Sequence, residues 1–395
     1  MSSRLAVAVC ATALVAAAAT TQQRVQQRLQ QAAPRREMHV VELSGTPYER
    51  GLQHGETLRA AIAEMLAHWR RDVRKATGRE ADDFVARFLA ATHFDDAARR
   101  HTPELLDEVR GIAAGAGQPF ATMFCYQLID ELWALGHTVA TDKCSTVGVD
   151  RTGDAPAFVA QNLDLPQWMH AHPTLLRIRD ASRRGAAGAL ESLVVTLPGL
   201  VGGNGVNNHR VAVGVNTILS LRPSSDGLPV AFVVRGLLAC TSYADALQFL
   251  RDVPHASGQA YTVGGSDTAP CFEASAGGVV PWQPAGRNGW RWHTNSAEVS
   301  RDWAPHRVAL AAARGSASER APTCPRFAAL DRALPEGRWP DVEQVVTALC
   351  ESAAAPVCND MTYCCTVMVL GERPELRVAC GRPDQNAFVT FDFAK

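Results

Sequence analysis

The sequence of 395 residues lacks the short motifs that mark several common enzyme classes. It has no Gly-x-Ser-x-Gly nucleophile elbow, so no motif indicates a serine α/β-hydrolase. It has no Cys-x-x-Cys pair, no His-Glu-x-x-His motif and no comparable Cys/His spacing, so we expect neither a metal site nor another cofactor. Lys and Arg total 39 against 40 Asp and Glu. That balance lacks the basic excess expected of a nucleic-acid-binding protein.

Long apolar runs are also missing, except at the amino terminus. Arg4 precedes the uncharged run Leu5–Ala19, which ends in small residues as secretory signal peptides do. The run is shorter than the roughly 20 residues that span a bilayer as a helix. We therefore predict a signal peptide over residues 1–20, followed by a polar lead-in over 21–38. A secreted or periplasmic protein without stable membrane insertion follows from this, and an uncleaved anchor is the alternative.

Cysteine, by contrast, is not scarce. The chain has 11 cysteines, and ten of them lie beyond the predicted signal peptide. An oxidising compartment favours disulfide bonds, most of them in the C-terminal part. Connectivity does not follow from the spacing, and a cysteine reserved for chemistry would leave an odd number for pairing.

The chain changes in character after Lys143. Between Tyr48 and about Trp133, apolar residues recur at spacings of three and four, which predicts helices. Beyond Lys143, short runs rich in β-branched residues are separated by turn residues, which predicts strands. A helical front followed by a strand-rich remainder indicates an α+β layered domain instead of alternating βαβ units.

The strand-rich part also carries finer predictions. We expect helices at Val230–Leu250 and Pro305–Arg314, and a hairpin turn at Gly202–Gly205. The expected strands cover residues 146–149, 157–160, 193–196, 211–215, 366–370, 376–379 and 387–393.

One cysteine stands at the junction of the two parts. Cys144 begins the first expected strand, and Gln161-Asn162-Leu163-Asp164 ends the next one. A returning strand would bring Asp164 back beside Cys144. A cysteine there is activated if its own backbone amine serves as the base, which requires cleavage of the Lys143–Cys144 bond.

These stretches resemble the acyl-coenzyme A:6-aminopenicillanic acid acyltransferase (isopenicillin N acyltransferase) family, which is autoproteolytic and belongs to the N-terminal nucleophile hydrolases. The resemblance runs from about residue 40 to 395 and consists of several motifs in order. They are Gly45–Gly55, Cys144-Ser145-Thr146, Gln161–Asp164, Asn204–Asn216, Val233–Leu238, His293–Ser296 with Arg307, and Cys380–Pro383.

This resemblance implies a four-layer αββα sandwich. It also implies self-cleavage into an α chain that includes residues 39–143 and a β chain of residues 144–395, which remain associated as one domain. The implied activity is that of a cysteine amidohydrolase or acyltransferase. Its substrate would be a small N-acyl amide or peptide-like amide, attacked to give a thioester acyl-enzyme.

The strand-rich part is more distantly similar to the choloylglycine (bile salt) hydrolases. Three positions depart from the two families. Lys143 stands where the acyltransferases often carry a small residue, and Gln161 stands where choloylglycine hydrolases use Arg. Ser296 stands where acyltransferase relatives often have His.

The resemblance assigns roles to individual residues. Cys144 would be the nucleophile, with its freed α-amine as general base. Asp164 would orient that amine or the thiol. Asn216 and Asn295 would donate N–H groups to the oxyanion. Without the resemblance, Cys144 would be an ordinary strand cysteine or one half of a disulfide, and Asp164 would be a turn carboxylate. The two asparagines would simply be turn formers.

Supporting roles fall to three further residues. Arg307 would hold Asp164 or the active-site loop through a charge-assisted hydrogen bond, unless it is simply a solvated helix arginine. Gln161 and Asn162 would support the site from behind the reacting groups.

Four tryptophans flank Asn295 and form either an apolar acyl pocket or part of the core. They are Trp282, Trp290, Trp292 and Trp303. The alternative to an enzyme is a secreted binding protein that keeps the same fold, with Cys144 in a disulfide.

Overall fold

The computed structural model describes residues 37–138, 144–305, 324–334, 337, 339–351 and 357–393. The predicted signal peptide, nearly all of the lead-in, Lys143 and Arg307 lie outside these residues. So does all but the first residue of the helix expected over Pro305–Arg314.

Two β-sheets form the centre of the molecule. The larger sheet has eight strands in the order β1-β4-β5-β6-β7-β8-β9-β10. Its strands are β1 (His39–Leu43), β4 (Thr174–Gly185), β5 (Gly188–Thr196), β6 (Asn204–Asn207), β7 (Ala212–Thr217), β8 (Gln259–Gly264), β9 (Cys271–Ser275) and β10 (Gly278–Trp282). All neighbours are antiparallel except β1, which pairs in parallel with β4.

The smaller sheet has six strands in the order β11-β2-β3-β12-β13-β14, all antiparallel. They are β11 (Trp290–His293), β2 (Ser145–Val149), β3 (Phe158–Asp164), β12 (Thr362–Val369), β13 (Glu375–Cys380) and β14 (Val389–Asp392). Strands β2 and β12 are buried along their whole length. Side chains on both faces of a strand are buried only when both faces of its sheet are covered.

The two sheets pack face to face. Val159 of β3 and Val213 of β7 belong to one apolar core. Polar side chains also cross between the sheets, since Asn204 donates from Nδ2 to Gln161 Oε1 at 2.9 Å and Thr146 donates to Asn216 Oδ1 at 2.6 Å.

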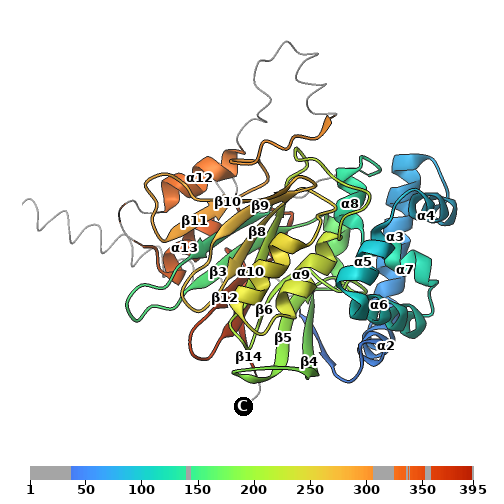
Figure 1. The fold of residues 1–395 in the computed structure, drawn as a ribbon, viewed down its shortest axis with the longest axis horizontal. Coiled ribbons are helices and arrows are strands. Elements are labelled where there is room, and N and C mark those ends of the chain that lie inside the picture. The colour runs from blue at the N-terminus through green and yellow to red at the C-terminus, as the bar shows by residue number, and fades with distance from the viewer. Residues whose placement is uncertain are drawn as a thin grey trace, which may run out of the picture.

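Helices cover the two outer faces (Figure 1). α9 (Val230–Leu238) and α10 (Tyr243–Asp252) lie on the eight-stranded sheet, and all nine residues of α9 are buried. α12 (Pro325–Ala333) and α13 (Val342–Leu349) lie on the six-stranded sheet. The layer order is therefore helix, sheet, sheet, helix. This confirms the predicted α+β fold with an αββα sandwich.

The helical front segment lies together at one end of the sandwich, blue to cyan in Figure 1. Its helices are α2 (Pro47–Thr57), α3 (Arg59–Thr77), α4 (Ala81–Ala90), α5 (Phe94–His101), α6 (Pro103–Ala116), α7 (Phe120–Tyr126) and α8 (Ile129–Ala134). Their apolar faces share one core cluster with the eight-stranded sheet. Strand β1 ties the beginning of this segment to the edge of that sheet.

Helix capping and close helix packing explain the residues of the Gly45–Gly55 motif. Thr46 and Glu49 form a reciprocal capping box that starts α2. Further along, the backbones of α2 and α6 approach so closely that a Cβ atom on Gly51 would lie 1.9 Å from the Glu108 carbonyl oxygen. A Cβ atom on Gly111 of α6 would lie 2.1 Å from the Tyr48 carbonyl oxygen. Only glycine permits this crossing.

A buried ion cluster joins the same helices to α9. Glu108 is fully buried and accepts hydrogen bonds from Arg235 at 2.7 and 3.0 Å. Arg50 of α2 approaches Glu108 at 3.5 Å. The two guanidinium groups offset the burial of the carboxylate, so its pKa is lowered although burial alone would raise it.

Two details of the sequence prediction are wrong. Asn204 and Gly205 lie in strand β6, where a Cβ atom on Gly205 would lie 2.2 Å from the Leu193 carbonyl oxygen. The glycine therefore serves a close strand contact and not a turn, and the hairpin turn follows Asn207. The single helix expected over Val230–Leu250 is in fact two helices, because the helical conformation is interrupted between α9 and α10.

We predict that Gly111→Ala destabilises the protein by at least about 2 kcal/mol, although alanine favours helices by about 1 kcal/mol over glycine. The reason is the overlap of the new methyl group with the α2 backbone. Chemical denaturation checks the difference. Gly371→Ala is the control, because its Cβ atom would meet nothing closer than 3.8 Å. Equal stabilities of the two variants would contradict the close-packing account.

Candidate active site

Cys144 comes directly before β2, at one end of the six-stranded sheet. It is buried, with 3% of its surface exposed. Ser145 is paired with Asn162 of β3, so antiparallel register brings Cys144 opposite Leu163. Both Cys144 and Leu163 line the same pocket.

Asp164 ends β3, one residue beyond Leu163, and is fully buried. The position is therefore diagonal to Cys144 across the strand pair, as the sequence predicted from a returning strand. Cys364 of β12 lies near both residues. Burial raises the pKa of the Cys364 thiol well above its usual value, and Cys380, Cys144 and Asp164 act in the same direction.

Arg326 is a site residue that sequence reasoning missed. It lies in the first turn of α12 and is 5% exposed. Its guanidinium donates to the Cys144 carbonyl oxygen, to Ser145 Oγ and to Asn295 Oδ1, each at 2.7 Å. Arg326 thus connects the cysteine with one of the predicted oxyanion residues. Nothing in the sequence distinguishes it from the other arginines.

Asn216 and Asn295 are brought together near the beginning of β2. Asn216, on β7, accepts from the Thr146 hydroxyl, and its Nδ2 lies 3.5 Å from the His293 carbonyl oxygen. Asn295 follows β11 and donates from Nδ2 to the Thr217 carbonyl oxygen at 2.9 Å. Each amide nitrogen carries two N–H groups, so these contacts leave donor capacity on both.

The loop after Asn295 is held by a buried carboxylate. Glu273 of β9 accepts from His293 Nε2 at 2.9 Å and from the backbone N–H groups of Glu298 and Ser300. These donors lower the pKa of Glu273 although burial alone would raise it. The carboxylate therefore fixes the backbone that follows Asn295.

The supporting residues make structural contacts. Gln161 donates to the Val215 carbonyl oxygen across the two sheets. Asn162 points to the opposite face and donates to the carbonyl oxygens of Leu349 and Val357 at 2.8 and 3.1 Å. Gln161 therefore aligns the two sheets, and Asn162 fixes the chain at α13.

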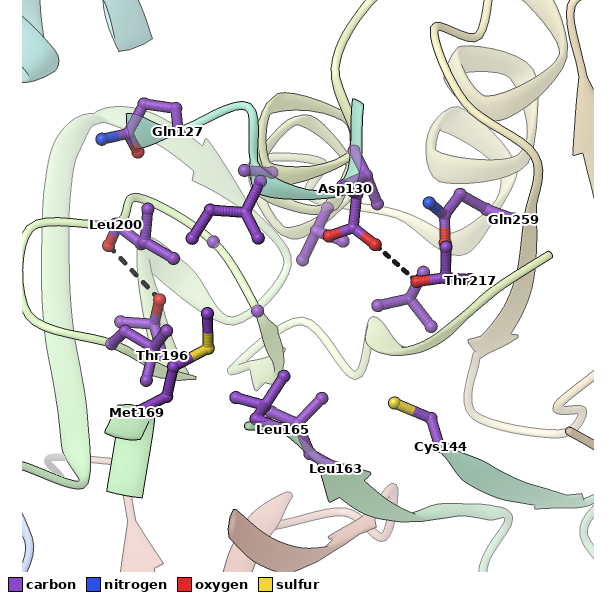
Figure 2. A pocket seen from close by; sticks show the side chains of 18 of the residues that line it. Gln127, Asp130, Cys144, Leu163, Leu165, Met169, Thr196, Leu200, Thr217 and Gln259 are labelled. Carbon is purple, nitrogen blue, oxygen red and sulfur yellow. Dashed lines mark hydrogen bonds between the residues drawn. The ribbon is translucent and has the colours of Figure 1, made fainter. Parts of the chain in front are cut away.

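An apolar pocket opens beside Cys144 (Figure 2). It has a volume of about 80 Å³, which at about 10–15 Å³ for each water holds several water molecules or a small organic group. Both parts of the chain contribute to it. The lining residues are Gln127, Ile129, Asp130, Trp133, Cys144, Leu163, Leu165, Met169, Thr196, Leu197, Leu200, Gly202, Gly203, Val215, Thr217, Val230, Ala231, Val234 and Gln259.

Buried polar side chains fix the loop between β5 and β6, which forms one wall of the pocket. Gln127 donates to the Gly199 carbonyl oxygen at 2.8 Å and accepts from the Val201 N–H at 2.9 Å. His54 of α2 accepts from the Gly199 N–H at 3.0 Å. Burial lowers the pKa of His54 to about 4, so the imidazole is neutral at pH 7 and can accept this hydrogen bond.

Asp130 lines the pocket, and Glu131, the next residue, does not. Asp130 accepts a hydrogen bond from the Thr217 hydroxyl. Glu131 is fully buried and accepts from the Val230 N–H and the Ser257 hydroxyl. Burial, and then the charge of Asp130, raises the pKa of Glu131 to about 8. Burial also raises the pKa of Asp130. Sequence reasoning did not single out either acid.

The four tryptophans are not part of this pocket. Trp290 and Trp292 belong to the core beneath α12 and α13, and Trp303 belongs to a smaller core cluster. The acyl-pocket interpretation is therefore wrong and the core interpretation is right, because β11 turns its aromatic side chains toward the outer helices. Trp133 of α8 is the tryptophan that lines the pocket.

Several expectations concern disulfides, metals and membranes. The described part of the chain contains ten cysteines and no disulfide, so the predicted disulfides are not confirmed. Within these residues no cluster of His, Cys, Asp and Glu is arranged to hold a metal ion. None of the described helices has both the length and the apolar character needed to cross a bilayer.

The described residues thus show the four-layer fold that the resemblance implied, with Cys144 directly before strand β2. Comparison with known proteins gives a match to one protein family. Residues 152–314 match the profile of the acyl-coenzyme A:6-aminopenicillanic acid acyl-transferase family. The matched range includes Asp164, Asn216 and Asn295 and begins after Cys144.

Two individual proteins are similar to parts of the chain. The chain is 26% identical over 273 residues to the acyl-coenzyme A:6-aminopenicillanic-acid-acyltransferase 40 kDa form of Emericella nidulans, a match that covers 65% of this chain and 69% of the relative. Penicillin V acylase from Agrobacterium tumefaciens is a solved structure with a TM-score of 0.33 and 14% identity, covering 63% of this chain and 86% of that one. The resemblance to the acyltransferase family is therefore confirmed by the profile match and by the Emericella nidulans protein.

We predict that Arg326→Met lowers the free energy of unfolding by about 2–4 kcal/mol, because three acceptors around Cys144 lose a charged donor. Denaturant titration measures the loss. Arg332→Met on the same helix is the control. Arg332 is exposed, so its replacement should change stability by less than about 0.5 kcal/mol. A loss at position 326 no larger than at 332 would contradict the role given to Arg326.

Proposed function

We propose that the protein is a secreted, self-processing cysteine amidohydrolase or acyltransferase that acts on small N-acyl amides. The observation that supports this most is the position of Cys144. It lies before a buried strand, beside Asp164 and at the wall of an apolar pocket, and Arg326 holds its carbonyl oxygen. The relationship to acyltransferases and acylases supports the same reaction class.

The first step is cleavage of the Lys143–Cys144 bond. It frees the α-amine of Cys144, whose reference pKa of about 8 suits a general base near neutral pH. The amine takes the thiol proton, and Sγ attacks the carbonyl carbon of the amide substrate. Asp164, at the end of the neighbouring strand, is the group that orients the amine.

The tetrahedral intermediate carries a negative oxygen, which Asn216 and Asn295 stabilise with their remaining N–H groups. Collapse of the intermediate breaks the carbon–nitrogen bond. The leaving amine takes the proton held by the α-amine, and a thioester remains on Cys144. Water then releases a carboxylic acid, or an amine acceptor releases a new amide. Arg326 keeps Asn295 in place.

The lining of the pocket supports a particular kind of acyl group. Its leucine, valine and methionine side chains favour an apolar acyl group, and its volume favours a short one. Acyl-coenzyme A is scarce outside the cytoplasm, and we therefore favour hydrolysis of an N-acyl amide.

The two chains produced by cleavage would stay together. Residues of the front segment share the core of the eight-stranded sheet, and β1 is hydrogen-bonded to β4. Separation would expose this core to water, which disfavours it strongly. The front segment also supplies Gln127, Asp130 and Trp133 to the pocket.

N-terminal sequencing and intact mass of the purified protein test the proposal. We expect a piece of about 27 kDa that begins Cys-Ser-Thr and a piece of about 13 kDa that begins beyond Ala19, since the reaction needs an N-terminal nucleophile. Cys144→Ala should remain a single chain with no turnover, whereas Cys125→Ala, the control for a buried cysteine outside the site, should be cut normally. An uncut wild-type chain would favour the binding protein, whereas turnover by Cys144→Ala would overturn the assignment of Cys144 as the nucleophile.

A further inference from the structure

Asp130 differs from every other residue that lines the pocket. Among the described residues it is the only lining side chain, apart from Cys144, that carries a group ionising below pH 10. The remaining lining side chains are apolar or neutral. Figure 2 shows its carboxyl group pointing into the pocket, on the wall across from Leu163 and Leu165.

The other polar groups of the lining are already used by the protein. Gln127 holds the loop at Gly199 and Val201, and the Thr196 hydroxyl donates to the Leu200 carbonyl oxygen at 3.3 Å. The Thr217 hydroxyl donates to Asp130. A carboxylate has about four acceptor positions, so the hydrogen bonds from Thr217 and Gln259 leave Asp130 able to accept more from a ligand.

The surroundings of Asp130 are rich in acceptors. Gln259 donates from its side-chain amide to Ser257 at 3.0 Å and also to Asp130, and its Oε1 is buried without a hydrogen-bond donor. No lysine or arginine lines the pocket in the described part of the chain. A group that donates hydrogen bonds and carries positive charge would offset the burial of these acceptors, whereas a carboxylate would be repelled.

We propose that Asp130 is a specificity-determining residue that binds an ammonium group of the substrate, so that the N-acyl amides accepted by this protein carry a basic nitrogen. This inference rests on the proposed function for the reaction itself and adds the class of substrate. Because Asp130 lies in the front segment and Cys144 in the strand-rich part, recognition and reaction come from the two sides of the predicted cleavage point.

Three small probes of similar size test this recognition: pentylamine, 1-pentanol and pentanoate. At pH 7.5 the amine is a cation, the alcohol is neutral and the acid is an anion. Each is titrated into the purified protein by calorimetry, and each is also tested for protection of Cys144 against iodoacetamide, read by peptide mapping. Calorimetry does not depend on Cys144 chemistry, so it remains informative if the protein is uncut or inactive.

We expect pentylammonium to bind at least about tenfold more tightly than pentanol, because it makes a charge-assisted hydrogen bond to the Asp130 carboxylate. Pentanoate should bind most weakly. Asp130→Asn should bind amine and alcohol equally, because the amide keeps the acceptor for Thr217 but lacks the charge. Asp82→Asn, an exposed acid of α4, is the control and should keep the preference. Equal binding of amine and alcohol by the wild type, or an amine preference that survives in Asp130→Asn, would overturn the proposal.

Discussion

The face-to-face packing of the two sheets is the constraint on which the site depends. It buries one face of β2, while α12 and α13 cover the other, and the direction in which Cys144 enters the molecule is thereby fixed. Thr146, two residues further along, reaches across to Asn216, and Gln161 reaches across to Val215. The position of the thiol relative to the asparagines is therefore set by sheet packing and not by a flexible loop.

The second constraint is the attachment of the front segment. Its helices cover no sheet face by themselves, yet they supply part of the pocket wall and hold the loop at Gly199 through Gln127 and His54. The close crossing of α2 and α6 and the buried Glu108–Arg235 pair make this segment a firm part of the domain. Cleavage before Cys144 would consequently change the chemistry of the cysteine without dismantling the pocket.

The sequence was sufficient for the layered fold and for the region of the site. Apolar periodicity separated the helical front from the strands, and the returning strand brought Asp164 toward Cys144. Asn204-Gly205 was misread because the dipeptide favours turns, whereas here the missing Cβ atom lets β6 approach β5. Local preference was overridden by strand pairing.

The residues that were missed depend on tertiary packing alone. Arg326 reaches Cys144 only because α12 lies over the end of the six-stranded sheet. Asp130 meets Thr217 only because α8 packs against the end of β7, across 87 residues of sequence. No spacing rule connects such pairs. The tryptophans were ambiguous for a related reason, since aromatic residues serve cores and pockets equally well.

In the proposed mechanism, the sulfur atom of Cys144 takes up the acyl group. Rapid acid quenching during turnover of an N-acyl amide, followed by mass spectrometry of the peptide that contains Cys144, measures this directly. The account predicts that this peptide gains the mass of the acyl group and loses it on treatment with hydroxylamine, as a thioester does. An acyl group found on another residue would contradict it. So would turnover without any acylated peptide under conditions in which deacylation is the slow step.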